Sequence, residues 1–313
     1  MFYTRKCGEI EESDFGSEQT LCGWLQDTRN LGGIAFLQLR DITGVIQLTL
    51  LKKKLGDENF KSWANINRES IILVRGIVKE NKEAPGGVEM LPDNIELMNE
   101  AETPLPLGVI DKIDSEIETR LNARYLDLRK TEIAANFQIR ATISGAVHKH
   151  LRRENFLEVQ TPKIIASATE GGTSLFEMKY FDKTAYLAQS PQLYKQILMS
   201  GGLERVYEVG PAFRAEEHNT PRHLNEFISI DIEMSFADDD VVMGVMERLV
   251  ATAARAVTKE TKALKTLGIE PIELELPLPR ITYDEAVEMA QGKVKWGEDL
   301  SMEATRTIAE LMN

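Results

Sequence analysis

Five β-rich segments with one helical segment after the third occupy most of the first hundred residues of this 313-residue chain. Apolar residues alternate with polar ones, or β-branched residues form short runs, and Gly-containing turns separate the segments. The segments are Thr20–Thr28, Ile34–Arg40, Val45–Leu50, Ser70–Lys79 and Val88–Met98, with the helix at Asp57–Asn65. This is the element order of a five-stranded OB-fold barrel. We therefore expect an OB-fold β-barrel in residues 1–103.

Barrels of this kind commonly bind single-stranded nucleic acid through aromatic and polar side chains on one face. The candidates here are Trp24, Gln26, Arg29, Phe36 and Gln38. For the two aromatic residues a place in the barrel core is the more common alternative.

A proline-rich connector, Glu102–Gly108, marks the clearest boundary. Two prolines two residues apart favour a stiff, extended chain. We expect a hinge at residues 104–130 and a second domain at residues 131–313. That domain opens with an amphipathic helix, Glu132–Asn155, and a strand, Phe156–Pro162.

Two further apolar-rich strands, Arg205–Ala215 and Glu226–Phe236, flank the charged loop Glu216–Asn225. Ordinary hairpin loops are shorter, about 2–5 residues, and rich in Gly or Asn. An Arg and a His facing one another across such a hairpin could hold a polyphosphate. A Glu two residues after the Arg, on the same strand face, could accept a hydrogen bond from an adenine amine. The alternative is a surface hairpin with solvated ion pairs.

The amino-acid sequence of this hairpin resembles motif 2 of the class II aminoacyl-tRNA synthetases. The matching segments are Phe213-Arg214-Ala215-Glu216 and Arg222-His223-Leu224-Asn225-Glu226-Phe227. The longer stretch GPAFRAEEHNTPRHLNEF is similar to aspartyl-tRNA synthetases of the archaeal and eukaryotic type. The resemblance implies a class II catalytic domain, an α+β fold in which helices flank an antiparallel sheet.

Motif 1 of the same family is similar to Glu132–Pro162. Motif 1 forms the dimer interface in that family, so the resemblance implies a homodimer with Phe156 and its neighbours buried between the subunits. From the residues alone, a helix packed on its own domain is the alternative.

The resemblance also implies roles for the residues of motif 2. Arg214 would bridge the α-phosphate of ATP and the substrate carboxylate, and Glu216 would bind the adenine amine. Arg222 and His223 would hold the terminal phosphates. Leu224 completes this ATP-binding segment, and Phe227 would stack on adenine.

A second candidate site begins at Ser190-Pro191, a typical start of a helix. Gln192 and Lys195 then share one face near the helix N-terminus, where a carboxylate ligand is favoured. The segment QSPQLYKQ resembles the family's aspartate-recognition segment. The small, polar stretch Ile164–Phe176 resembles a loop that closes over the amino acid, and its acid is Glu170. By composition alone this stretch is a solvated surface loop.

These likenesses imply an aspartate–tRNA ligase that uses ATP and Mg²⁺ to activate L-aspartate. Family members continue beyond the equivalent of Asn313 with a metal-binding acidic strand and motif 3. We therefore expect a truncated catalytic domain with no metal ligands in this chain, and no activity of the chain alone. The alternative is a non-catalytic protein that binds tRNA and dimerises, built from a truncated synthetase.

Composition limits the partners. The net charge of −13 argues against sequence-indifferent nucleic-acid binding, which depends on Lys and Arg. No apolar run approaches the ~20 residues of a membrane span, and the N-terminus has no signal-peptide core. Two cysteines, Cys7 and Cys22, make no disulfide framework. A cytoplasmic protein without a membrane partner is expected.

Two residues of the barrel bear on the choice of tRNA. Family members that charge only tRNA(Asp) tend to carry an aromatic residue on the first strand and a Lys before the last strand. This chain has Gln26 and Pro85 there. Proline offers neither a backbone donor nor a basic side chain to a base edge. We expect charging of both tRNA(Asp) and tRNA(Asn), although Pro85-Gly86-Gly87 is also an ordinary turn composition.

Overall fold

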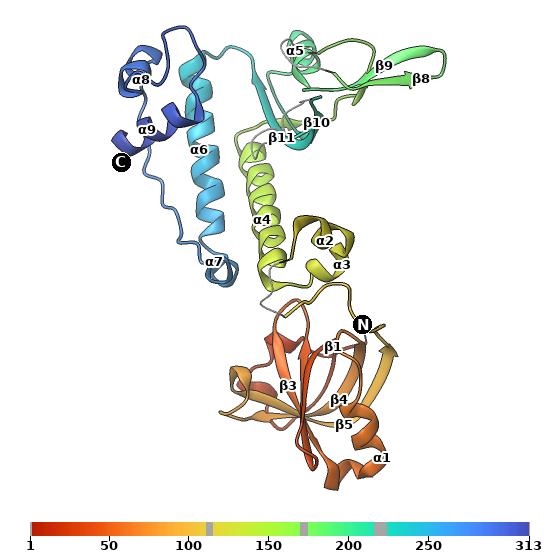
Figure 1. Cartoon of the computed structure of the whole chain (residues 1–313). Helices are drawn as coiled ribbons and strands as arrows, with labels where there is room; N and C mark the ends of the chain where they lie inside the picture. Colours follow the sequence, from red (N-terminus) through yellow and green to blue (C-terminus); the bar gives the residue numbers. More distant parts are fainter. Residues whose placement is uncertain (1, 111–114, 170–174, 216–223, 313) are drawn as a thin grey trace. The chain divides into compact units, whose positions relative to one another are not determined.

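The computed structural model describes residues 2–110, 115–169, 175–215 and 224–312 (Figure 1). The chain forms two compact units, Met1–Phe137 and Gln138–Asn313. Within the described ranges, no helix combines the length and hydropathy needed to cross a bilayer.

The first unit contains a closed barrel with strand order β1-β2-β3-β5-β4. Its elements are β1 Glu18–Asn30, β2 Ile34–Arg40, β3 Val45–Leu51, α1 Lys52–Ala64, β4 Ile71–Glu80 and β5 Val88–Asn99. Alternation builds the core: on β2, Ala35, Leu37 and Leu39 are buried, whereas Phe36 and Gln38 lie on the opposite strand face. The predicted OB-fold barrel, with its helix after the third strand, is confirmed.

Two short helices follow the barrel, α2 Ile117–Asn122 and α3 Arg124–Asp127. They pack a small apolar cluster that includes Leu107 and Leu126. The fully buried Asp127 receives hydrogen bonds from the guanidinium groups of Arg120 and Arg124. The segment predicted as a hinge therefore contains local helical structure that its sequence pattern did not indicate.

The second unit is organised on a three-stranded sheet with order β11-β10-β6. The main elements are α4 Thr131–Arg153, which begins in the first unit, β6 Leu157–Glu158, β10 Arg205–Phe213, β11 Glu226–Met234 and α6 Asp239–Val257. β10 and β11 pair antiparallel along their whole length, and β6 pairs parallel with β10. Residues of α4 and α6 pack a core against one sheet face, through Val147, Leu151, Tyr207, Val245 and Leu249. The predicted sheet flanked by helices is confirmed.

A smaller sheet has the order β7-β9-β8. Its strands are β7 Ile164–Ile165, β8 Glu177–Tyr180 and β9 Lys183–Leu187. The remaining helices are α5 Gln192–Ser200, α7 Thr261–Leu267, α8 Tyr283–Met289 and α9 Met302–Met312. Residues of α8 and α9 share an apolar cluster of their own.

The expectation that Phe156 of motif 1 is buried between two subunits is wrong. Phe156 is only 4% exposed in the single chain, where it packs with Leu151 and Tyr207, and the Arg205 guanidinium lies 5.9 Å from its ring centroid. A side chain that is already buried cannot supply the apolar surface of a dimer interface. The neighbouring Leu157, in contrast, is 53% exposed.

Candidate functional site

The two faces of strand β11 differ in chemistry. Ser229, Asp231 and Glu233 lie on one face, and Ile232 and Met234 on the other pack against the core below α4 and α6. The register places Glu208 of β10 opposite Asp231. Strand alternation therefore puts the polar side chains on the sheet face away from those helices.

Lys195 of α5 lies over this polar face. Its side chain is almost fully buried, and its Nζ lies 3.1 Å from Asp231 Oδ1 and 3.4 Å from Glu233 Oε2. The ammonium group also donates to the Ile232 carbonyl oxygen at 3.1 Å. A buried cation needs such partners, because desolvation would otherwise make its charged form costly. Lys195 was predicted from the sequence as a site residue, whereas Asp231 and Glu233 were not.

The start of α5 is close to the predicted one. The helix begins at Gln192, and Ser190 Oγ accepts a hydrogen bond from the Gln192 backbone N–H at 3.2 Å. Gln192 is half-buried, one turn before Lys195. The two predicted aspartate-binding residues of this segment therefore stand on one short helix that contacts β10 and β11.

Arg214 follows directly after β10. Its backbone N–H donates to the Asn225 carbonyl oxygen at 3.0 Å, which continues the pairing with the segment before β11. The guanidinium carbon lies 5.5 Å from the ring centroid of Phe227. Among the described residues, Nε of Arg214 is buried and has no hydrogen-bond partner. A buried unsatisfied guanidinium donor is suited to an anionic acceptor such as a phosphate or carboxylate.

The other predicted residues divide into two groups. Leu224 is exposed and lines a groove with Ile143 of α4 and Ile228 of β11, which also includes Phe227. Glu170, Glu216, Arg222 and His223 lie outside the described residues.

Glu208 was not predicted. Its carboxylate is buried and accepts hydrogen bonds from the Thr161 backbone N–H at 3.1 Å, Thr161 Oγ1 at 2.7 Å and Lys163 Nζ at 2.7 Å. These bonds tie the segment before β7 to the polar face of β10. A signal was present, because Glu208 is the one acid within the apolar strand β10, and polar residues at every second position interrupt β11 at Ser229, Asp231 and Glu233.

A groove on the barrel contains several of the residues proposed for nucleic-acid contact. It is lined by residues of β1, β2, β3 and β5 and of the segment between β4 and β5, among them Arg29, Phe36, Gln38, Asn81, Pro85 and Glu89. Gln26 Nε2 donates to Gln38 Oε1 at 3.1 Å and thus lies beside the groove. The structure therefore places Gln26 and Pro85 at one surface, although they are far apart in sequence.

Glu89 is the buried acid of this groove. It accepts hydrogen bonds from Thr49 Oγ1 at 2.5 Å and Asn81 Nδ2 at 2.9 Å, and Lys79 Nζ lies 3.0 Å away. Burial raises the pKa of Glu89, but the bonds from Thr49, Asn81 and Lys79 outweigh it and hold the pKa below its usual value. The groove therefore contains a fixed negative charge that sequence analysis did not identify.

Trp24 is placed differently from Phe36. It is half-buried, does not line the groove, and the Arg129 guanidinium lies 5.0 Å from its ring centroid. Within the described part of the chain, its indole Nε1 is buried without a hydrogen-bond partner.

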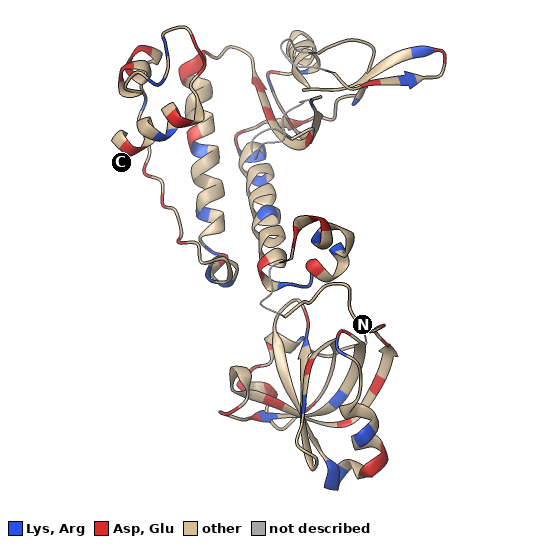
Figure 2. Ribbon diagram, in the orientation of Figure 1, with Lys and Arg blue, Asp and Glu red and all other residues tan. Residues whose placement is uncertain are grey.

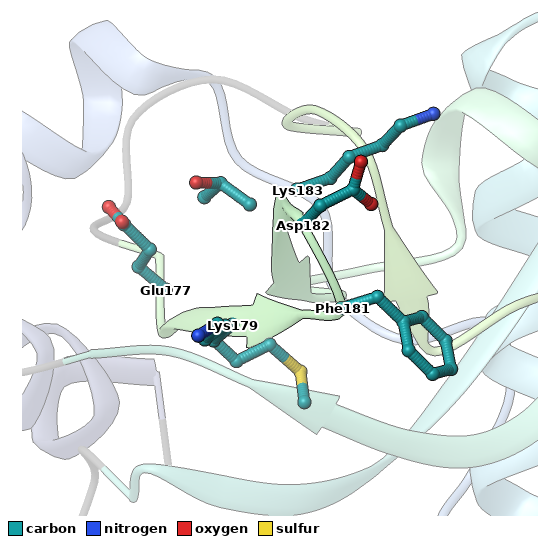
Figure 3. A pocket seen from close by; sticks show the side chains of 7 residues that line it. Glu177, Lys179, Phe181, Asp182 and Lys183 are labelled. Atoms are coloured by element: carbon teal, nitrogen blue, oxygen red, sulfur yellow. The ribbon is translucent and has the colours of Figure 1, made fainter.

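A further hollow lies at the β8–β9 hairpin (Figure 3). Glu177 and Lys179 on β8, Phe181 and Asp182 at the turn and Lys183 at the start of β9 line it. It contains none of the predicted site residues, and Phe181 points into solvent with 80% of its surface exposed.

Comparison with known proteins finds a matching family for each of the two parts of the chain. Residues 116–312 match the family of class II tRNA synthetases (D, K and N), and residues 19–98 match the OB-fold nucleic-acid-binding domain family. An aspartate–tRNA(Asp/Asn) ligase of Methanopyrus kandleri is 52% identical over 95% of this chain and 70% of its own length. An aspartate–tRNA(Asp) ligase of Thermococcus kodakarensis is 47% identical over 100% of this chain and 72% of its own.

Among solved structures, the asparaginyl-tRNA synthetase of Pyrococcus horikoshii in complex with asparaginyl-adenylate superposes with a TM-score of 0.89 at 33% identity. The match covers 99% of this chain and 73% of that one. From the barrel, the sheet with its polar face and these matches together, we conclude that the chain belongs to the class II tRNA synthetases of the D, K and N family.

Proposed function

We propose that this protein is an aspartate–tRNA ligase. The α-carboxylate of L-aspartate attacks the α-phosphorus of ATP, the bond to pyrophosphate breaks, and aspartyl-adenylate forms. The 3′-terminal hydroxyl of the tRNA then attacks the aspartyl carbonyl carbon and AMP leaves. The observation that carries this proposal is Arg214, whose buried Nε lacks a partner among the described residues and whose guanidinium faces Phe227.

The protein's part in this chemistry is positioning and charge stabilisation. Arg214 holds the α-phosphate and the attacking carboxylate together, and Phe227 stacks on adenine. Glu216 binds the adenine amine, Arg222 and His223 hold the outer phosphates, and Leu224 belongs to the same ATP-binding segment.

Aspartate itself carries charges of both signs. We assign Lys195 and Gln192, with Glu170, to its recognition. Because Lys195 is flanked by Asp231 and Glu233, the polar sheet face offers a donor to the substrate carboxylates and acceptors to its ammonium group. This pairing of charges explains why a chain rich in acids can recognise an acidic amino acid.

ATP and Mg²⁺ complete the proposal as cofactors. In the ranges that the structure describes, no group of three or more His, Cys, Asp or Glu side chains is arranged to hold a metal ion. The described residues therefore do not fit a magnesium site, and no step is assigned to the ion here.

The finer assignments follow the barrel and its relatives. We propose that the OB-fold domain at residues 1–103 binds the anticodon, that residues 104–130 form a hinge, and that residues 131–313 belong to the catalytic domain. The tRNA partners are tRNA(Asp) and tRNA(Asn), in line with Gln26 and Pro85 and with the name of the Methanopyrus kandleri relative. The protein acts in the cytoplasm as a homodimer.

Substitution of Arg214 tests the function. In the protein with its full catalytic domain, Arg214→Ala should lower aspartate-dependent ATP–pyrophosphate exchange about a hundredfold or more, as expected for the loss of a charge-stabilising donor. Arg205→Ala, at the start of the same strand, is the matched control and should leave exchange close to normal. Unchanged exchange in Arg214→Ala would refute the assignment.

A further inference from the structure

A groove runs between helices α4 and α6 on the second unit. It is lined by Thr142, Gly145, Ala146, Lys149, His150 and Arg153 of α4, by Thr252, Arg255 and Ala256 near the end of α6, and by Lys259 just after it. Thr142 Oγ1 donates to Glu260 at 2.8 Å, and His150 Nδ1 lies 3.1 Å from Thr252 Oγ1. The two helices therefore run antiparallel along the groove, and within the described ranges no acidic residue lines it.

The floor of the groove is formed by small or uncharged side chains. Gly145, Ala146 and Ala256 leave room between the helices. Thr252 Oγ1 uses its hydrogen on the Arg248 carbonyl oxygen, so it accepts from His150 Nδ1–H. Burial lowers the pKa of His150, and the nearby charges of Arg248 and Arg153 lower it further. The negative charge of Glu154 raises it, but only in part. The imidazole is therefore neutral at pH 7.

Two acids, Glu154 and Glu260, lie near the ends of the groove without lining it. Glu154 accepts two hydrogen bonds from the Arg248 guanidinium, at 3.0 and 2.9 Å, and Glu260 accepts one from Thr142. The charge of Glu154 is thus compensated by Arg248 before any ligand binds, whereas Glu260 keeps its negative charge beside the other end of the groove.

The rim carries four exposed cations, Lys149, Arg153, Arg255 and Lys259. None of them forms an ion pair with another described residue, whereas Arg152 and Arg248 on the same helices each pair with a glutamate. Figure 2 shows Lys and Arg along both helices. In a chain with a net charge of −13, four uncompensated cations around an acid-free groove make a locally positive surface.

The spacing of the cations favours an extended polyanion over a small anion. On α4 the two cations are four residues apart, which is about 6 Å along the helix axis, whereas Arg255 lies in the last turn of α6 and Lys259 two residues beyond its end. All four have long, solvated side chains, and this arrangement suits successive phosphates of a backbone more than one enclosed phosphate.

We propose that the α4–α6 groove binds the phosphate backbone of the tRNA substrate, a contact separate from the anticodon and the acceptor end. The proposal rests on the proposed function, which supplies an RNA partner. It also answers how an acidic protein contacts RNA, since a few grouped cations provide the attraction that the net charge does not.

The test uses the protein with its full catalytic domain and a transcript of tRNA(Asp). The double variant Lys149→Gln/Arg255→Gln should weaken binding about tenfold and lower the slope of log K against log salt by about 1.5, the value for two lost phosphate contacts. The matched control Lys179→Gln/Lys183→Gln removes two exposed cations from the β8–β9 hairpin and should leave both quantities unchanged. The charge-conserving variant Lys149→Arg/Arg255→Lys should retain the salt slope.

An unchanged affinity and salt slope in the Gln variant would overturn the proposal, as would an equal loss in the hairpin control. ATP–pyrophosphate exchange by the unaltered protein, which needs no RNA, tests the proposed function separately. Normal exchange with an unaltered salt slope would thus refute the groove and leave the ligase assignment standing.

Discussion

Lys195 shows how a single buried charge can shape a site. Its ammonium group has two carboxylates and a carbonyl oxygen within 3.4 Å, all from β11. It therefore fixes α5 to the sheet as well as offering a charge to substrate. Asp231 and Glu233, two residues apart on one strand face, would repel one another without it.

Replacing Lys195 with Met should therefore destabilise the fold. We expect a loss of about 1–3 kcal/mol in the free energy of unfolding, because two partly buried carboxylates lose their cation. Urea unfolding followed by circular dichroism measures this, and the exposed Lys179→Met should change it by no more than about 0.5 kcal/mol. Adding Asp231→Asn to Lys195→Met should recover part of the loss. Equal stabilities of the two Lys variants would contradict this account.

Pro85 acts at the same scale in the barrel groove. Because proline offers no donor to a base edge, the unaltered ligase should charge tRNA(Asp) and tRNA(Asn) with comparable efficiency. Pro85→Lys should restore part of a preference for tRNA(Asp), whereas Pro85→Ala should not. A hundredfold preference in the unaltered ligase, about 2.7 kcal/mol, would show that this residue does not relax discrimination.

At the scale of elements, the segment between barrel and catalytic sheet depends on one carboxylate. Burial raises the pKa of Asp127, but hydrogen bonds from Arg120 of α2 and Arg124 of α3 outweigh it and hold the pKa below its usual value. Its stabilising effect is therefore present above the pKa of the unfolded chain, near 4, and is lost as pH falls through the lower folded pKa.

Asp127→Asn should lower the free energy of unfolding by about 2 kcal/mol at pH 7, the order expected for hydrogen bonds to a buried charge. The difference from the unaltered chain should begin to shrink below about pH 4, where the unfolded chain takes up a proton at this position, and should shrink further as Asp127 is protonated in the folded chain. Urea titrations at pH 7 and pH 3 make the comparison. The exposed Asp93→Asn, which breaks a surface pair with Lys54, serves as the control and should have little effect at either pH. A difference that is the same at both pH values would show that Asp127 acts by packing alone.

Elements in which apolar and polar residues alternate regularly were predictable from the sequence. The barrel strands and the pair β10–β11 lie within about two residues of their predicted ends, because alternation and turn residues specify them locally. Helices α2 and α3 were missed because Asp127 and a small cluster stabilise them, and no long apolar stripe marks them. In the site, Lys195 was predicted from its place near a helix N-terminus and from the resemblance, and the role of Arg214 from the resemblance. Glu208 and Glu89 were missed, because their partners come from other segments: Thr161 and Lys163 lie in the loop before β7, and Thr49 lies on β3.

For the whole molecule, the exposed surfaces of α4 and β6 bear on assembly. Leu157 stands exposed beside the buried Phe156, and the proposed homodimer would use this surface if motif 1 acts here as it does in the family. An isologous contact uses the same patch of both subunits, so one substitution alters it twice.

Sedimentation at micromolar concentration should therefore show a sharp species of twice 35.2 kDa for the chain. Leu157→Glu should shift it to the monomer. The substitution removes an apolar contact from each subunit and places two like charges opposite one another across the interface. Ile272→Glu, at a similarly exposed position, is the control and should leave the dimer intact. A single 35.2 kDa species, or only broad large particles, would count against the dimer.

The two-faced chemistry of β11 also limits how this gene can change. A single inserted or deleted codon in the middle of the strand would exchange the faces of the residues beyond it, turning acids toward the core and apolar side chains toward Lys195. Length changes in multiples of two residues keep the alternation and spare both surfaces. Across distant lineages, insertions within this strand should therefore survive in even numbers, while substitutions that keep the alternation remain free to accumulate.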